Sequence, residues 1–190
     1  IEAATGRHVW AERYDRELAD VFAAQDEVTE AIVTAIAPAV SHLERERVRA
    51  SRCSCASMGA WENYQRGLWH VYRYSPKDIA EARQQFQCAI AVDPNFAPAH
   101  AGQAYALYVE AIWGYAADVG ANLQQARQSA QRALALDARD AFAHVVLGRV
   151  LINSGEVRAA LAECRLALVL NPNLAAAHFA LAYALGIAGR

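Results

Sequence analysis

Residues 141–174 restrict the possible fold of this chain more than any other segment, because two helical patterns follow one another there. The two runs lie on either side of Gly155, and the second run ends just before Pro172. Each run repeats its apolar residues at the three- and four-residue spacing of one helix face. These apolar residues are Leu147, Leu151, Leu161, Leu168 and Leu170. The segment is therefore predicted to form two helices joined by a short turn.

The order of small and bulky residues in this segment resembles a tetratricopeptide repeat, a helix-turn-helix unit of about 34 residues. Cys164 departs from that pattern, since the family usually has an aromatic residue at position 24. The resemblance implies an all-α solenoid in which successive helix pairs stack on one another. Numbered from Ala141, positions 7, 8, 15, 20, 27 and 32 are occupied by Leu147, Gly148, Gly155, Ala160, Ala167 and Pro172.

The same register predicts a tetratricopeptide repeat domain over residues 60–190, with about three and a half repeats. The second unit contains an insertion of about ten residues between Tyr108 and Asn122, which should lengthen both of its helices and its turn. An apolar fraction of 55%, much of it alanine, suits closely packed helices better than sheets. The predicted units are residues 60–96, 97–140, 141–174 and, in part, 175–190.

The first fifty or so residues follow a different pattern. Hydrophobicity partly alternates from His8 to Tyr14, as in a strand, and becomes helical after Asp20. Residues 3–33, AATGRHVWAERYDRELADVFAAQDEVTEAIV, resemble the last strand and helix of the TolB-like domain of some bacterial multidomain proteins. Residues 1–52 are thus predicted to be a short strand-helix remnant of that domain, and residues 53–59 a linker.

The TolB-like resemblance implies a larger protein, and the absence of an initiator Met fits a piece of one. In such proteins an output module precedes the TolB-like domain, and tetratricopeptide repeats follow it. The module is usually a class III adenylate or guanylate cyclase domain or a winged helix. Residues 61–74, WENYQRGLWHVYRY, are similar to the first repeat of the cyclase-linked group. No cyclase catalytic residue falls within this chain, so the cyclase assignment is by association.

Three histidines, His100, His144 and His178, are the first candidates for chemistry. All three fall at position 4 of their units, where the family packs an aromatic residue between helices. Stacked repeats would hold them much farther apart than one metal ion can bridge, so packing is favoured over metal binding. No nucleophile–base motif and no phosphate-binding glycine loop is present. The segment is predicted to be non-enzymatic, without metal or cofactor.

Charge and hydropathy argue against two classes of partner. The net charge is −2 and no block of five or more basic residues occurs, which gives nucleic-acid binding little electrostatic support. No apolar run reaches the roughly 18–20 residues that a membrane span requires. Four cysteines in 190 residues do not make a disulfide framework, so a reducing compartment, the cytoplasm, is expected.

A protein or peptide partner remains, because tetratricopeptide repeats line a concave groove with their first helices. Arg149 is the expected anion contact in a groove that is otherwise apolar and aromatic. The alternative for several of these residues is packing against the insertion. The groove-facing positions are occupied by Phe142, Val145, Arg149, Ile152, Asn153, Phe179 and Tyr183.

The fourth unit supplies a single helix, which would leave an apolar stripe without a cover. Large exposed apolar patches are rare in soluble monomers, so a homo-oligomer or a longer repeat array is expected. The residues predicted for self-association are Leu174, Phe179, Leu181 and Leu185.

These patterns together predict a non-catalytic interaction and regulatory segment of a bacterial cyclase-like signalling protein. Two alternatives stay open: the same module on a winged-helix transcription regulator, and a free-standing scaffold or assembly factor. The upstream sequence of the natural gene product would separate the three.

Overall fold

The computed structural model describes residues 59–189 of the 190-residue chain. Every regular element within this range is an α-helix. The predicted strand and helix of residues 1–52, and residues 53–58 of the predicted linker, lie outside it. The described helices are α2 (Ala60–Val71), α3 (Pro76–Val92), α4 (Ala97–Ile112), α5 (Val119–Leu136), α6 (Ala141–Asn153), α7 (Val157–Leu170) and α8 (Ala175–Ile187).

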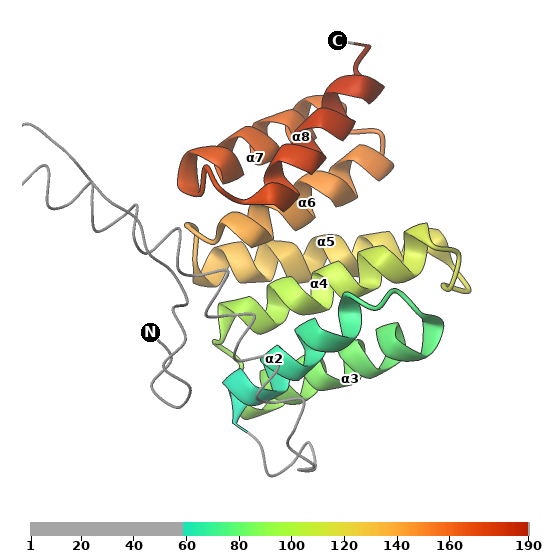
Figure 1. Ribbon diagram of the computed structural model, residues 1–190, viewed down its shortest axis with the longest axis vertical. Helices are drawn as coiled ribbons and strands as arrows, with labels where there is room; N and C mark the ends of the chain where they lie inside the picture. The colour runs from blue at the N-terminus through green and yellow to red at the C-terminus, as the bar shows by residue number, and fades with distance from the viewer. Residues whose placement is uncertain (1–58, 190) are drawn as a thin grey trace, which may run out of the picture.

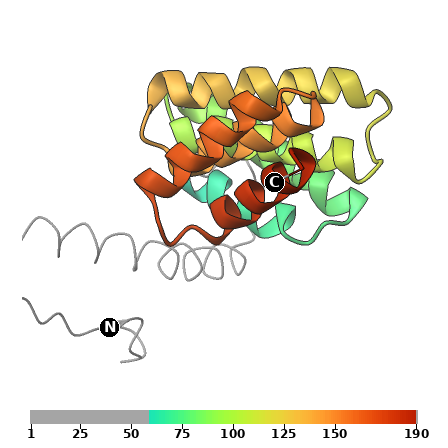
Figure 2. The same cartoon turned by 90° about the horizontal axis from the view of Figure 1, so that it is seen from above.

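Helices that follow one another in the chain pack as pairs, and the pairs stack (Figures 1 and 2). The pairs are α2 with α3, α4 with α5, and α6 with α7, and α8 packs on α6 and α7. The first helices of successive pairs also touch, so α2, α4, α6 and α8 share one face of the stack. This arrangement confirms the predicted all-α solenoid. None of the helices among the described residues combines the length and hydropathy that a membrane span needs.

The three loops between successive units share one hydrogen-bonding scheme. Asp93, Asp137 and Asn171 end their helices, and each accepts a backbone N–H two residues later at 2.9–3.1 Å through its side chain. Asp and Asn side chains commonly stabilise turns in this way. The repeat pattern of the sequence thus recurs in the loops.

The start of α3 is tied to the end of α2 through Asp78. Ser75 caps α3 by accepting the backbone N–H of Asp78 at 3.1 Å, and Pro76 occupies the first helical position. The Ser75 hydroxyl also donates to the Asp78 carboxylate, and so do His70 and Arg73 from the end of α2. These hydrogen bonds, that of Ser75 first, lower the pKa of Asp78 to about 2.

Alanine and glycine let the helices approach closely where the register predicts it. Gly148 on α6 lies over α7 so closely that a Cβ there would be 2.7 Å from the Cys164 Sγ and 3.4 Å from the Ala160 carbonyl. Ala160 and Ala167 are both fully buried. Cys164 therefore fills the space that an aromatic usually occupies, and burial raises the pKa of its thiol to about 11.

The insertion in the second unit is distributed as predicted. Helices α4 and α5 contain 16 and 18 residues, whereas α6 and α7 contain 13 and 14. The turn at residues 113–118 is also longer than the turn at 154–156. Ile112, the last residue of α4, and Trp113 in the turn after it are both more than 40% exposed.

Candidate functional site

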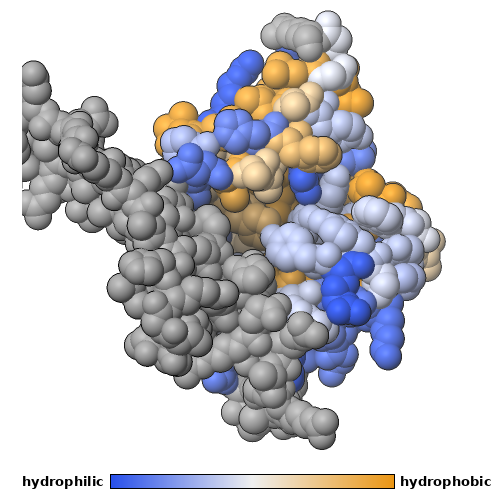
Figure 3. All heavy atoms as spheres, in the orientation of Figure 1, coloured by the Kyte–Doolittle hydropathy of each residue, from blue (hydrophilic) through white to orange (hydrophobic). Residues whose placement is uncertain are grey.

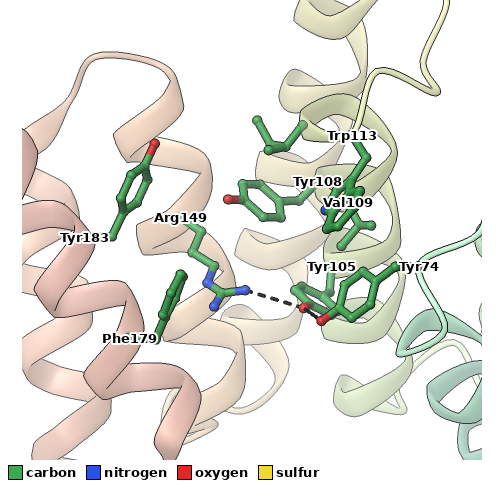
Figure 4. Close-up of a pocket in the computed structure, with 9 residues that line it drawn as sticks. Tyr74, Tyr105, Tyr108, Val109, Trp113, Arg149, Phe179 and Tyr183 are labelled. Carbon is green, nitrogen blue, oxygen red and sulfur yellow. Dashed lines mark hydrogen bonds between the residues drawn. The ribbon is translucent and has the colours of Figure 1, made fainter.

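A pocket of about 450 Å³ opens on the face formed by the first helices (Figure 4). The helices α4, α6 and α8 supply most of its wall, and the turn after α2 supplies Tyr74. A recess with apolar walls is visible on this face in the space-filling view (Figure 3). The lining residues are Tyr74, Tyr105, Tyr108, Val109, Ile112, Trp113, Arg149, Phe179 and Tyr183.

Arg149 projects from α6 into the middle of this pocket, between the rings of α4 and those of α8 (Figure 4). Its guanidinium carbon lies 5.1 Å from the ring centre of Phe179, 5.7 Å from that of Tyr105 and 6.0 Å from that of Tyr108. These separations are within the range of cation–π attraction. Its Nη1 donates a long hydrogen bond of 3.4 Å to the Tyr105 hydroxyl.

A chain of tyrosine hydroxyls connects the turn after α2 to the pocket. The hydroxyls of Tyr74 and Tyr105 are 3.0 Å apart, and the Tyr115 hydroxyl donates to the Tyr74 carbonyl at 2.9 Å. The Tyr74 ring stacks on Trp113, with centres 5.4 Å apart and planes at 23°. Residues from two different units therefore hold this wall of the pocket in place.

The tyrosines beside Arg149 stay protonated at neutral pH. Burial is the main cause that raises the pKa of both Tyr105 and Tyr108, and the charge of Arg149 offsets it only in part. The site therefore presents neutral phenols and one permanent positive charge. Such a site can bind an anion or accept apolar groups.

The predicted groove residues divide into three groups in the structure. Arg149, Phe179 and Tyr183 line the pocket. Val145 and Ile152 are wrong as partner contacts, because they are only 1% and 5% exposed. Val145 is enclosed by Cys164, Ala167 and two alanines of α8, and Ile152 belongs to the main core.

The other two predicted groove residues support the pocket from behind. Phe142 is half-buried and packs edge-on against the ring of Tyr105, with centres 5.5 Å apart. The Asn153 side chain donates to the Arg149 carbonyl at 2.9 Å. Both therefore hold the backbone and rings around Arg149 rather than line the cavity.

The sequence reasoning missed the side of the pocket that α4 and the first turn provide. Tyr105, Tyr108 and Trp113 lie in or next to the insertion, where the repeat register is interrupted. Tyr74, three residues after the end of α2, has a backbone φ of 53°, whereas Gly114 and Gly155, two residues after the ends of α4 and α6, have φ 73° and 81°. The turn after α2 has no glycine although the turns of the next two units do, and this was the available signal.

The apolar stripe predicted for self-association is oriented differently from the expectation. Leu174, Leu181 and Leu185 are half-buried and pack inward against the two cores. The exposed apolar side chains of α8 are Phe179 at 64%, Tyr183 at 41% and Ile187 at 54%. The three leucines therefore contribute to packing within the stack, and their part in self-association stays a prediction.

The three histidines occupy equivalent positions in their units, and they do not converge on one site. Each Nε2–H donates to a backbone carbonyl six residues earlier, at 2.9 Å for His100, 3.1 Å for His144 and 2.7 Å for His178. His144 also bonds to Glu163 at 2.6 Å through Nδ1. Within residues 59–189 no group of three or more His, Cys, Asp or Glu side chains is placed to hold a metal ion.

The cysteines differ from the expectation in one respect. Cys88 on α3 is disulfide-bonded, and Cys164 is free and buried. The cysteine content is therefore no longer an argument for a reducing compartment.

Comparison with solved structures identifies the class of this protein. A thermophilic tetratricopeptide repeat protein of Thermus thermophilus matches 85% of this chain and 79% of its own, with a TM-score of 0.63 and 18% identity. The first repeat domain of Spaghetti (RPAP3), bound to an HSP90 peptide, matches 69% of this chain and 94% of its own (TM-score 0.53, 16% identity). The second repeat domain of human RPAP3, bound to an HSP70 peptide, matches 64% and 91% (TM-score 0.50, 19% identity). The chain therefore has the tetratricopeptide repeat fold.

The chain is also similar in sequence to a known protein. The chain is 34% identical over 151 residues to "Putative adenylate cyclase 3" of Rhizobium meliloti (strain 1021). The aligned part is 80% of this chain, and the chain spans about a quarter of the relative's length. No protein-family model matches the chain.

Proposed function

We propose that residues 60–190 are a non-catalytic protein-binding module that regulates a bacterial adenylate cyclase-like signalling protein. The observation that carries the binding role is the pocket around Arg149, an accessible cavity of about 450 Å³ lined by aromatic rings. Pockets of this size and composition accommodate ligand side chains. The similarity to the Rhizobium protein favours a cyclase over a winged helix as the upstream module.

The regulatory step follows from how class III cyclase domains work, since the resemblance implies that they act as dimers. A partner bound across α4, α6 and α8 favours whichever arrangement of the stack fits it best. When binding changes the arrangement of the stack, the orientation of the upstream domains changes as well. A ligand shifts such an equilibrium only by its difference in affinity for the two states.

The test uses the full natural protein in a bacterial strain that lacks its own cyclase. Deletion of residues 60–190 should change cyclic nucleotide production by about fivefold or more, because about fivefold is the lower end of the effect that coupling between two sites usually produces. Arg149→Met should reproduce the change in regulated output. The control is Arg158→Met, an exposed arginine of α7 outside the pocket. Equal output from the parent and the deletion would remove the regulatory role.

Pairing of two copies through α8 is the second part of the proposal. Phe179 and Ile187 are 64% and 54% exposed on this helix, which is largely apolar apart from His178. An exposed apolar face of this kind favours association. Sedimentation velocity at increasing concentration should show a dimer, and Ile187→Asp should weaken it. A monomer at every concentration would contradict the pairing and leave the pocket unaffected.

A further inference from the structure

Among the described residues, no carboxylate neutralises the charge of Arg149. Among residues 59–189 no carboxylate pairs with it, whereas Arg83 on α3 pairs with Glu110 at 2.7 Å. Its Nε is buried without a hydrogen-bond partner, and within residues 59–189 its Nη1 makes only the long contact with Tyr105. A partly desolvated cation with unfilled donors is energetically unfavourable, and an incoming acceptor would relieve this.

The backbone strain at Tyr74 points to the same place. A non-glycine residue in the left-handed region is disfavoured by about 1 kcal/mol or more. Glycine, which the next two units have at this turn, would avoid this strain. The contacts that offset the strain are those with Tyr105 and Trp113 in the pocket wall. Strain stored in this way is typical of binding sites.

The aromatic surface continues beyond the pocket on the α2 side. Tyr72 is 46% exposed and its ring centre lies 6.0 Å from that of Tyr105. On the other side, Phe179 and Tyr183 extend the surface along α8. An extended peptide can therefore cross the pocket and continue on both sides. A peptide that continues on both sides has no terminus at the pocket, so in that arrangement the carboxylate that reaches Arg149 comes from a side chain.

We propose that this pocket binds an aspartate or glutamate side chain next to a large apolar side chain, within an extended peptide of a partner protein. The carboxylate accepts from the Nη atoms of Arg149, since Nε is enclosed. The apolar neighbour packs on Trp113, which is 55% exposed, or on Phe179. This inference rests on the proposed protein-binding function and specifies its ligand.

The test begins with a display library of random heptapeptides held between glycine-serine flanks, so that no peptide terminus can reach the pocket. The full chain should enrich peptides with Asp or Glu beside Phe, Trp, Leu or Ile. The best peptide is then synthesised with both ends blocked, in its acidic form and with that residue changed to the amide. Fluorescence anisotropy should show at least a tenfold weaker affinity for the amide peptide, the range of a lost charged hydrogen bond.

Variants of the protein assign the effect to the pocket. Arg149→Met should bind the acidic and amide peptides equally, and Arg158→Met should behave as the parent chain. Tyr74→Gly should lose affinity at least tenfold, while its thermal stability stays near that of the parent, because removed strain offsets the lost ring contacts. If the thermal stability of Tyr74→Gly falls enough to explain its loss of affinity, then Tyr74 has only a structural role.

The remaining outcomes separate this inference from the proposed function. Enrichment of purely apolar peptides, or equal affinity for the acidic and amide forms, would overturn the acidic specificity and leave protein binding intact. Binding that requires a free C-terminus would overturn the side-chain source of the carboxylate. If no peptide is enriched at all, both this inference and the peptide-binding function fail.

Discussion

Replacing Phe86 with alanine is expected to lower the free energy of unfolding by about 3–5 kcal/mol. The Phe86 ring on α3 is fully buried and fills the seam between α2 and α4. A Cβ added at Gly67 or Gly102 would lie only 2.5 or 2.4 Å from its Cε1 atom, so the ring touches both helix backbones. Its removal leaves a cavity that these helices cannot easily close.

Urea denaturation followed by circular dichroism would measure the effect of Phe86→Ala. The control is Val92→Ala on the same helix, because Val92 is 51% exposed and should change stability by less than about 0.5 kcal/mol. A loss below about 1 kcal/mol for Phe86→Ala would contradict the packing of the first two units. The m value, which is the dependence of the unfolding free energy on urea concentration, should stay unchanged if Phe86→Ala alters only the stability.

The second large effect is expected at the seam of the third unit. Gly148→Ala should lower the free energy of unfolding by about 1–3 kcal/mol, because the added methyl group overlaps the Cys164 Sγ. Helix propensity acts in the opposite direction, since alanine in a helix is favoured over glycine by about 1 kcal/mol. The steric term is expected to be the larger one, because Cys164 is fully buried and cannot move aside.

A double-mutant cycle isolates this contact. In a Cys164→Ala background the methyl group of Gly148→Ala has space, so the second substitution should become neutral or stabilising. Gly186→Ala on α8 is the matched control: a Cβ there meets nothing within 4 Å, and stability should rise by about 0.5–1 kcal/mol. Additive effects of Gly148→Ala and Cys164→Ala would show that the two residues do not share a contact.

The repeat pattern can be read from the sequence because its causes are local. Spacing alone assigns Gly148, Ala160 and Ala167 to a helix seam, and all three are buried there. Helix starts such as Ser75-Pro76 also depend on a few neighbouring residues. Such features recur in every unit, so one regular unit is enough to find the others.

The binding pocket was predictable only in part. Arg149, Phe179 and Tyr183 follow from the register of the third and fourth units, but the same register also selects Val145 and Ile152, which are buried. Accessibility at these positions depends on what the neighbouring helices cover. The insertion removes the register on the α4 side, so Tyr105, Tyr108 and Trp113 could not be aligned.

The sequence by itself determined that the described chain forms paired helices, which residues bring them close together, and how the loops between units are capped. These features follow from side-chain size, helical periodicity and hydrogen bonds over a few residues. Only the tertiary structure decided that Tyr74, Tyr105, Arg149 and Phe179 meet in one pocket, and that Arg149 has no carboxylate partner among the described residues. Those residues come from four different helices and turns, and their distances depend on how the units stack, which no local pattern encodes.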